Sequence, residues 1–415
     1  MNAVPALHLS GRATIDGVSI FGPLSLNAPA GKWTCLLGPS GVGKSTILRL
    51  LAGLGDEIAF DGEVATGDGA SLDGRVALMA QSDLLMPWLD VNANVTLGAR
   101  LRGEVPDRDR ARAMLERVGL TEHATKRRQG AADEAGSHHR RRPARGTDAS
   151  CLRCVRHARL PGPPAATAHG GPMRRAFHIA AVAFLGLLVW QAIITLADLP
   201  RFILPGPYLV FATLWNSRML IAEHALVTGV EVLLGLILGA ALGFTSAILM
   251  VASALARSVL RPMLVFSQAV PVFALAPILT LWLGYGLWSK VAMALLIIYF
   301  PVTSAFFDAL MRTPSGWLEL SRVMAATPLR VMWRIRVPAA MPGFASGLRL
   351  AAVYAPIGAI IGEWVGASRG LGYLMLLANG RAKIDLMFAA LIVLAVLTLI
   401  LHTAVDAVCR RLWRT

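Results

Sequence analysis

The sequence predicts a multi-spanning α-helical membrane protein that is preceded by a smaller α/β region. The chain has 415 residues, of which 55% are hydrophobic and 16% charged, whereas a soluble domain is typically about 45–50% apolar and about 25% charged. Residues 173–415 contain six long apolar stretches, and residues 1–124 alternate strand-like and helix-like runs around a glycine-rich loop. We therefore expect three regions, with a stretch rich in Arg, His, Pro and Gly over 125–172 between the other two.

Each apolar stretch is long enough to cross a hydrocarbon core, which takes about 20 helical residues. The six stretches are 177–197, 226–252, 263–284, 288–311, 340–365 and 385–408. Pro271, Pro277, Pro301 and Pro356 lie inside these stretches. They are tolerable, because neighbouring helices can satisfy the freed backbone groups. The expected fold is a six-helix membrane domain.

Basic residues predict how the chain is oriented. Arginines cluster before the first stretch, between the second and third, between the fourth and fifth, and after the sixth. Six crossings put all these clusters on one side, which the positive-inside rule makes cytoplasmic. We expect a multi-pass protein of the cell inner membrane with both termini in the cytoplasm. Residues Met1 to Gly17 contain no long apolar run, so no secretory signal peptide is expected.

The net charge of +15 has two sources, the arginine-rich loops and the 125–172 stretch. These sources make a nucleic-acid partner the weaker interpretation, and none is expected. The four cysteines, Cys35, Cys151, Cys154 and Cys409, form no disulfide framework. Cys151 and Cys154 have metal-like spacing, but no second pair follows, so chance explains them better than a zinc site.

A phosphate-binding loop is the main chemical motif of the N-terminal region. Gly38-Pro39-Ser40-Gly41-Val42-Gly43-Lys44-Ser45-Thr46 matches G-x-x-x-x-G-K-[ST]. The glycines let backbone N–H groups cradle phosphate oxygens, Lys44 reaches the β- and γ-phosphates, and Ser45 places a hydroxyl on Mg²⁺. An apolar run at 34–37 precedes the loop and a helical pattern over 45–54 follows it. With a strand candidate at 75–79 and an amphipathic helix at 110–118, this order predicts a partial α/β P-loop NTPase domain that binds ATP and Mg²⁺.

The following segment resembles the ATPases of ABC importers for nitrate, sulfonates and thiamine precursors. Gln81 follows the 75–79 run, and Pro87-Trp88-Leu89 and Asn92-Ala93-Asn94-Val95 come next. The resemblance runs from about Leu7 to Ala124. It implies that Gln81, like Ser45, contacts the metal and that an upstream aromatic stacks on adenine. Phe21 is the only aromatic residue before Trp33.

The family pattern stops after Ala124. The resemblance would next require an L-S-G-G-Q-type motif, a strand ending in Asp-Glu and a switch histidine, and 125–172 contains none of them. We expect no catalytic residues and no ATP hydrolysis by this chain alone, although nucleotide binding is expected if the fragment folds. A frameshift or gene fusion over 125–172 is our hypothesis for the break, and a natural disordered linker is the alternative.

The segment between the fourth and fifth stretches resembles the cytoplasmic coupling loop of ABC importer permeases. It reads Glu319-Leu320-Ser321-Arg322-Val323-Met324-Ala325-Ala326-Thr327-Pro328 and continues to Val337-Pro338-Ala339-Ala340-Met341-Pro342. The resemblance implies a short helix that docks into a groove of the ATPase. Its coupling residues would be Glu319, Leu320, Ala325, Ala326 and Pro338, although Ala325 stands where the family pattern has glycine. A basic solvated loop is the alternative.

The rest of 173–415 resembles permeases of the nitrate, sulfonate and taurine group. Residues 202–207 are typical of that group, and 270–277, 283–286 and 362–373 look closest to permeases for hydroxymethylpyrimidine, a thiamine precursor. Ionisable residues inside a membrane helix are costly and often functional. Arg349 and Glu363 are therefore candidates for the substrate path, with Gln268 and Trp364 as weaker ones, and Arg349 could instead snorkel.

The resemblance implies a permease that works by alternating access. Its partners would be a second permease subunit, intact ABC ATPase subunits and a periplasmic solute-binding protein. A functional ATPase–permease fusion, an importer for sulfonate, nitrate or taurine, and a non-transporting membrane scaffold are the alternatives.

Overall fold

The computed structural model describes residues 4–39, 41–55, 57–72, 75–79, 84–127, 172–198 and 200–412. The chain forms two compact units. Met1–Pro143 and Arg312–Ala340 make up the first, which we call the N-terminal unit. Ala144–Met311 and Met341–Thr415 make up the second, the membrane unit.

A three-stranded antiparallel sheet opens the N-terminal unit. Its strands β1 (Leu7–Ile15), β2 (Val18–Ala28) and β3 (Ala59–Thr66) lie in the order β2-β1-β3. Asp16 and Gly17 join β1 to β2, and both have positive φ angles, of 48° and 79°. Such a pair gives a tight turn whose twist matches that of the two strands. Leu9 and Ala13 of β1 are fully buried and mark the inner face of the sheet.

Short helices follow, and two of them are capped by aspartate. They are α1 (Lys44–Leu51), α2 (Val91–Val95), α3 (Leu97–Arg102), α4 (Arg108–Arg117) and the 3₁₀ turn η1 (Thr121–His123). The Asp90 carboxylate accepts a hydrogen bond of 2.6 Å from the backbone N–H of Ala93 at the start of α2. Asp107 accepts one of 2.9 Å from the N–H of Arg110 at the start of α4. These bonds satisfy N–H groups that have no partner within the helix.

Two strands expected from the sequence do not form. Residues 34–37 and 75–79 have no strand pairing, and Leu37 and Met79 are 89% and 94% exposed. A parallel strand of an α/β fold is stabilised by neighbours on both sides and by helices on both faces. The part of the chain that resembles an ATPase ends before the later strands, so the described residues supply no such neighbours. The expected α/β layers are therefore reduced to a small sheet with flanking helices.

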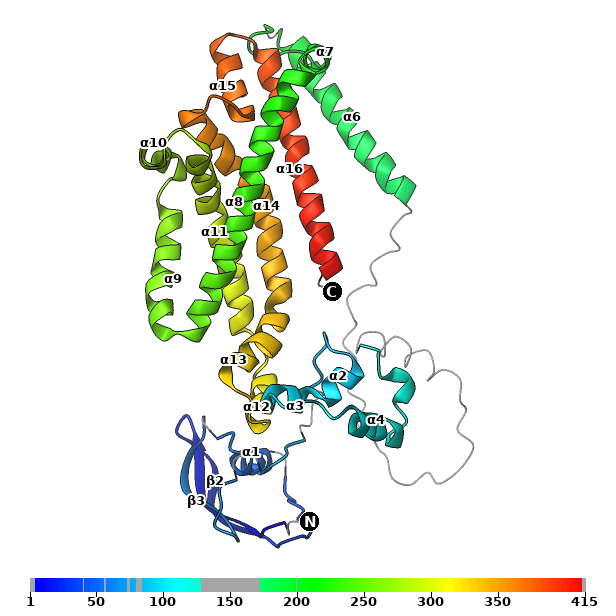
Figure 1. The fold of residues 1–415 in the computed structure, drawn as a ribbon, viewed down its shortest axis with the longest axis vertical. Coiled ribbons are helices and arrows are strands. Elements are labelled where there is room, and N and C mark those ends of the chain that lie inside the picture. The colour runs from blue at the N-terminus through cyan, green and yellow to red at the C-terminus, as the bar shows by residue number, and fades with distance from the viewer. Residues whose placement is uncertain are drawn as a thin grey trace. The chain divides into compact units, whose positions relative to one another are not determined.

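The membrane unit consists of helices, drawn from green to red in Figure 1. They are α6 (Pro172–Leu196), α7 (Pro207–Asn216), α8 (Arg218–Ala252), α9 (Ala254–Ala269), α10 (Val272–Leu283), α11 (Leu287–Met311), α14 (Val337–Gly366), α15 (Leu371–Gly380) and α16 (Ile384–Leu412). Figure 1 shows α8, α14 and α16 running along the length of the unit. All six predicted apolar stretches fall on helices.

Four helical segments of the described chain are long and apolar enough to cross a membrane, or five if a bent pair counts as one span. The four are Arg218–Ala252, Leu287–Met311, Pro328–Gly366 and Ile384–Leu412. The first predicted stretch contributes a shorter apolar segment, Phe184–Leu196. The membrane character is thus confirmed, and the count of six spans stays a prediction.

The third predicted stretch is not one straight helix. It divides into α9 and α10, which meet at an angle of 105°. Val270, just before Pro271, has an extended backbone with ψ of 122°, as the ring of a following proline favours. Pro277, Pro301 and Pro356 instead lie inside continuous helices. The helix therefore breaks at Pro271 and continues through Pro277, Pro301 and Pro356.

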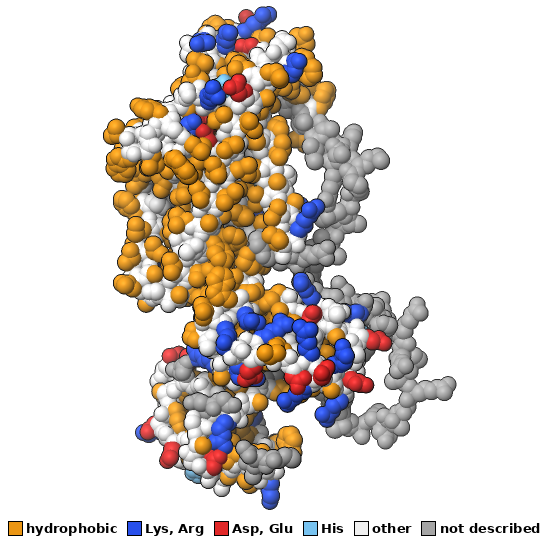
Figure 2. All heavy atoms as spheres, viewed as in Figure 1, with side chains coloured by type: hydrophobic (Ala, Val, Ile, Leu, Met, Phe, Trp, Pro, Cys, Tyr) orange, Lys and Arg blue, Asp and Glu red, His pale blue; other side chains and the backbone are white. Residues whose placement is uncertain are grey.

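Small residues let α8 and α11 approach closely. A Cβ atom on Gly235, Gly239 or Gly243 would lie 2.6, 3.0 or 2.9 Å from side-chain atoms of Ala294, Ile298 or Val302, respectively. Glycines spaced by four residues face one way on a helix, and such a stripe is common where membrane helices pack. Hydrophobic side chains dominate the central band of the membrane unit in Figure 2, and charged ones lie at its upper end. Charged side chains also gather over the helices of the N-terminal unit.

Candidate functional site

The phosphate loop lies between β2 and α1. Gly41 and Gly43 both have a φ of 88°, in the left-handed region that glycine adopts most readily. The Lys44 ammonium donates hydrogen bonds of 2.7 and 2.6 Å to the carbonyl oxygens of Gly38 and Pro39. The lysine side chain thus folds back over the loop that precedes it, and α1 begins at the same residue.

The described residues of this loop fit a nucleotide phosphate. Glycine backbone with positive φ and a helix N-terminus both favour an anion. Lys44 is the residue that would meet the β- and γ-phosphates, and Ser45, which is exposed, would supply a hydroxyl for Mg²⁺. The ring of Phe21 lies beside the loop, 3.0 Å from where a Cβ of Gly43 would stand. Of the other loop residues, Val42 lies in the bend before α1 and Thr46 lies in the first turn of that helix.

Three sequence-predicted features lie outside the described residues. They are Ser40 of the phosphate loop, Gln81, and the pair Cys151 and Cys154. Within the described chain no group of three or more His, Cys, Asp or Glu side chains could hold a metal ion. The role of Gln81 at the metal therefore stays a prediction.

A second site joins distant parts of the N-terminal unit. We call residues 312–340 the docking segment; it contains α12 (Ser315–Val323), α13 (Pro328–Val331) and the π-helical turn η2 (Met332–Arg336). Arg49 of α1 and Glu319 of α12 form a salt bridge of 2.6 Å. The rings of Trp88 and Trp317 meet edge to face, with centroids 5.1 Å apart. The helix that begins at the phosphate loop therefore ends against the docking segment.

An apolar cluster fills the centre of this contact. Met86, Leu97, Leu101 and Ile335 form its buried core. The partly buried side chains packed against it are Trp88, Leu89, Trp317, Leu320, Met324, Ala326 and Val331. Four of them, Leu320, Met324, Ala326 and Val331, come from the predicted coupling region, which is therefore not a solvated loop. Pro338, the last predicted coupling residue, is half-buried at the start of α14.

Arginines frame the cluster. Arg330 donates a hydrogen bond of 3.3 Å to the backbone carbonyl of Leu101 and another to that of Arg102. Its guanidinium fills the space that a Cβ would need at Gly103, where φ is 85°. Arg102 binds the Glu104 carboxylate at 2.7 Å, and this hydrogen bond lowers the pKa of Glu104. The cation of Arg330 thus binds the C-terminal end of α3, where the helix dipole favours positive charge.

The turn after α12 has a backbone that explains the family pattern. Ala325 has a φ of 53°, in the left-handed region. An L-residue with a side chain is strained there, whereas glycine is not. The alanine that replaces the glycine of the coupling-loop pattern therefore keeps the turn and accepts its strain.

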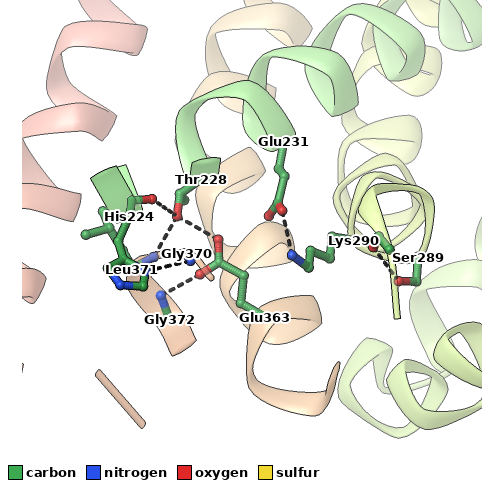
Figure 3. A network of polar contacts seen from close by, with 10 residues as sticks. His224, Thr228, Glu231, Ser289, Lys290, Glu363, Gly370, Leu371 and Gly372 are labelled. Atoms are coloured by element: carbon green, nitrogen blue, oxygen red, sulfur yellow. Dashed lines mark hydrogen bonds and ion pairs between the residues drawn. The ribbon is translucent and has the colours of Figure 1, made fainter. Parts of the chain in front are cut away.

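A polar network lies inside the membrane unit, where α8, α11, α14 and the start of α15 come together (Figure 3). Glu363 of α14 is 1% exposed, and its carboxylate accepts a hydrogen bond of 2.6 Å from the Thr228 hydroxyl. The same carboxylate accepts a short hydrogen bond from the backbone N–H of Gly372. His224 Nδ1 and the Thr228 hydroxyl oxygen accept from the N–H groups of Gly370 and Leu371, at 2.9 and 2.8 Å.

This network fixes the loop that leads into α15. Gly370 has a φ of 117°, and a Cβ there would clash with the Glu363 carboxylate. Beside it, Lys290 of α11 and Glu231 of α8 form a buried salt bridge of 2.7 Å. The second carboxylate oxygen of Glu231 is buried and has no hydrogen-bond partner among the residues that the structure describes.

The four candidate path residues are not brought to one place. Gln268 is exposed on α9, and Trp364, 42% exposed, adjoins the buried Glu363. Arg349 lies fourteen residues before Glu363 on α14, which is about 21 Å along a helix. It forms a salt bridge of 2.8 Å with Asp406 of α16. Their role in a substrate path stays a prediction.

Of the buried network, only Glu363 was predicted from the sequence to be functional. His224, Thr228, Glu231 and Lys290 were not singled out. The available signal was spacing, because positions 224, 228 and 231 share one helical face. Glu231 and Lys290 lie near the ends of two apolar stretches, and Glu363 lies in a third. Charged residues in such positions would have indicated an ion pair between the helices.

Known proteins match both parts of the chain. Residues 232–414 match the family described as "Binding-protein-dependent transport system inner membrane component", and residues 21–141 match the family "ABC transporter". A probable ABC transporter permease of Haemophilus influenzae is 50% identical over 225 residues, which cover 54% of this chain and 92% of that protein. These matches confirm both resemblances found in the sequence.

Two further permeases have named substrates. The formylaminopyrimidine transport permease ThiX of Halalkalibacterium halodurans is 39% identical over 188 residues, covering 45% of this chain and 75% of that protein. The riboflavin transport permease RibX of Chloroflexus aurantiacus is 36% identical over 230 residues, covering 55% and 86%.

The N-terminal region matches only part of an ATPase. The aliphatic sulfonates import ATP-binding protein SsuB 2 of Agrobacterium fabrum is 41% identical over 114 residues, which cover 27% of this chain and 41% of that protein. The permease match, by contrast, spans nearly the whole of a relative. The chain therefore belongs to the family of binding-protein-dependent transport system inner membrane components, the permeases of ABC transporters, and carries an N-terminal ABC transporter region.

Proposed function

We propose that this chain is the permease subunit of an ATP-driven importer that moves a thiamine-precursor pyrimidine across the inner membrane. ABC permeases of this kind work with ATPase subunits and a substrate-binding protein. The specific partners that we propose are a second copy of this chain, intact ATPase subunits and a periplasmic solute-binding protein. Both termini would lie in the cytoplasm, as the arginine clusters favour.

The observation that carries this proposal is the unequal coverage of the two parts. The chain spans 92% of a permease relative but only 41% of an ATPase relative. A nearly complete permease domain therefore accompanies an incomplete nucleotide domain. We infer domain boundaries at 1–124 for the partial ATPase, 125–172 for the junction and 173–415 for the permease.

The substrate class rests on two observations. One is the resemblance of residues 270–277, 283–286 and 362–373 to hydroxymethylpyrimidine permeases. The other is the 39% identity to a formylaminopyrimidine permease. The riboflavin permease is nearly as similar, so a flavin is the second candidate, and sulfonate, nitrate and taurine remain weaker ones.

The test begins with the solute-binding protein encoded beside this gene. Its affinity for hydroxymethylpyrimidine, formylaminopyrimidine, riboflavin, taurine and nitrate is measured by calorimetry. Uptake of the preferred solute is then followed in proteoliposomes that contain this chain, that binding protein and an intact ATPase. Preference for a sulfonate or nitrate would contradict the substrate class, and uptake of the bound solute would exclude a non-transporting scaffold.

A functional ATPase–permease fusion is the second candidate, because the phosphate loop is intact. Lys44→Ala separates the two. If the chain supplies only the permease, uptake driven by a separate ATPase keeps its rate in this variant. If the chain supplies the motor, uptake falls by the 10²-fold or more expected when a phosphate-binding group is lost.

A further inference from the structure

The docking segment is already covered by the chain's own N-terminal fragment. Arg49, Trp88 and the buried side chains Met86, Leu97 and Leu101 contact α12, α13 and η2 from the fragment side. Under the proposed function, an intact ATPase subunit would have to use this same segment. Two proteins cannot occupy one face at once.

We propose that residues 1–127 act as an intramolecular cap, which closes the docking segment to separate ATPase subunits until the cap leaves. The contact has the composition of a stable interface. Its buried core is apolar and two partly buried tryptophans pack against that core. A cation binds at each side, Arg49 to a carboxylate and Arg330 to backbone carbonyls. Central aromatic anchors surrounded by polar contacts are typical of surfaces that bind tightly.

The cap has an advantage over any separate competitor. Both sides of the contact belong to one chain, so its formation does not require an encounter between two molecules. Tethered partners reach effective concentrations in the millimolar range. A separate ATPase at about 1 μM would therefore need roughly a 10³-fold greater intrinsic affinity to displace the cap. This inference rests on the proposed function for the identity of the displaced subunit, but the covering itself can be tested alone.

The experiment measures how fast cysteines in the docking segment react with a maleimide on a protein-sized polymer. The full-length chain is purified with Cys35, Cys151, Cys154 and Cys409 changed to serine. Leu320→Cys reports on the covered face, because Leu320 packs against the apolar cluster. Leu329→Cys is the matched control, because Leu329 belongs to the same segment and is 70% exposed. We expect the cysteine at 320 to react at least about tenfold more slowly than the one at 329.

Changes on the fragment side should remove this protection. Leu101→Asp places a carboxylate in the apolar core, and Arg49→Glu sets a like charge against Glu319, while neither alters the docking segment itself. We expect either change to raise the rate at position 320 by about tenfold, since an unpaired buried charge is strongly disfavoured. Arg110→Glu, an exposed charge reversal on α4, should leave that rate unchanged.

Three results would overturn the cap. The first is equal reactivity at positions 320 and 329 in the otherwise unaltered chain. The second is protection at 320 that survives both Leu101→Asp and Arg49→Glu. The third is protection that disappears on dilution from 10 to 0.1 μM (concentrations chosen on the order of the affinities typical of separate partners), because the cover would then come from a second copy. None of these results bears on uptake, so the cap can fail while the permease function stands.

Discussion

The left-handed backbone of Ala325 explains why the coupling-loop pattern has glycine at this position. Its φ of 53° follows from the turn that ends α12 and redirects the chain into α13. The left-handed conformation costs an L-residue roughly 1–2 kcal/mol, and the packing of Met324 and Ala326 against the apolar cluster keeps it in place. The sequence showed that a glycine was replaced here, but only the structure showed what that glycine does.

Ala325→Gly should therefore be tolerated, and Ala326→Gly should not. The first change relieves backbone strain while making the unfolded chain more flexible, and these effects nearly cancel, leaving about 0–1 kcal/mol of stabilisation. Ala326→Gly relieves no strain. It only makes the unfolded chain more flexible and removes a packed methyl group, which costs about 1 kcal/mol of stability. Hydrogen exchange of amides 315–331 measures the local opening free energy. Greater loss of protection in Ala325→Gly than in Ala326→Gly would contradict this view of the turn.

Glu231 and Lys290 are charged residues that depend on one another. Both are almost fully buried, and their salt bridge is 2.7 Å long. Removing one partner leaves an uncompensated charge in an apolar interior, whereas removing both takes away the desolvation cost together with the attraction. We therefore expect single and double substitutions of this pair to change the free energy of unfolding by different amounts or in opposite directions.

Lys290→Met alone should lower the stability of the membrane unit by about 3–5 kcal/mol. The double variant with Glu231→Leu should recover most of that loss. Thermal unfolding in a mild detergent, followed by the burial of cysteine at position 409, compares the two variants with the parent chain. A double variant that is less stable than Lys290→Met would show that Glu231 has another partner of greater importance.

Helix α8 packs closely against α11 because glycines occupy the face where the two helices meet. The glycine stripe at 235, 239 and 243 lets the backbone of α8 approach α11. The hydrophobic pattern of the segment does not reveal which face of α8 makes this contact.

The break between α9 and α10 depends on the backbone next to one proline. Of Pro271, Pro277, Pro301 and Pro356, only Pro271 follows a residue whose extended backbone ends a helix.

Gly239→Leu should disrupt the contact between α8 and α11, since its Cβ would stand 3.0 Å from the Ile298 side chain. Overpacking of this kind costs about 1–3 kcal/mol. Gly229→Leu is the matched control on the same helix, where the nearest atom, on Leu397, is 4.0 Å away. Thermal unfolding should place the control close to the parent chain. Equal losses in the two variants would mean that the stripe does not set the helix spacing.

The whole molecule combines a nearly complete permease with part of an ATPase. The fragment exposes apolar surface, including a hollow of about 770 Å³ lined largely by apolar side chains of α2 and α4 and the segments beside them. Within the described residues it also leaves the 34–37 and 75–79 runs without strand partners. A domain in this condition can hold a phosphate loop, but the sequence predicts that it does not hydrolyse ATP by itself.

We expect the purified full-length chain to show no ATP turnover above that of its Lys44→Ala variant. Release of inorganic phosphate from ATP and Mg²⁺ measures this directly, and an intact ATPase subunit serves as the positive control. Turnover that depends on Lys44 would contradict the expectation and would favour a functional fusion.

The sequence by itself determined the membrane character, the phosphate loop and the family of both parts. These properties depend on local composition and spacing, which a single chain displays directly. It also located the docking segment through Glu319 and the residues that follow it. It failed where a strand needs neighbours, as at Leu37 and Met79.

Tertiary structure alone decided which residues meet. The pairing of Glu231 with Lys290, of Arg349 with Asp406 and of Arg49 with Glu319 joins residues that lie 57 to 270 positions apart in the chain. Charged side chains in an apolar interior are stable only beside a partner, but their spacing in the sequence does not identify that partner. The covering of the docking segment by the N-terminal fragment is likewise a property of the folded chain, because each face shows its complement only when both are folded.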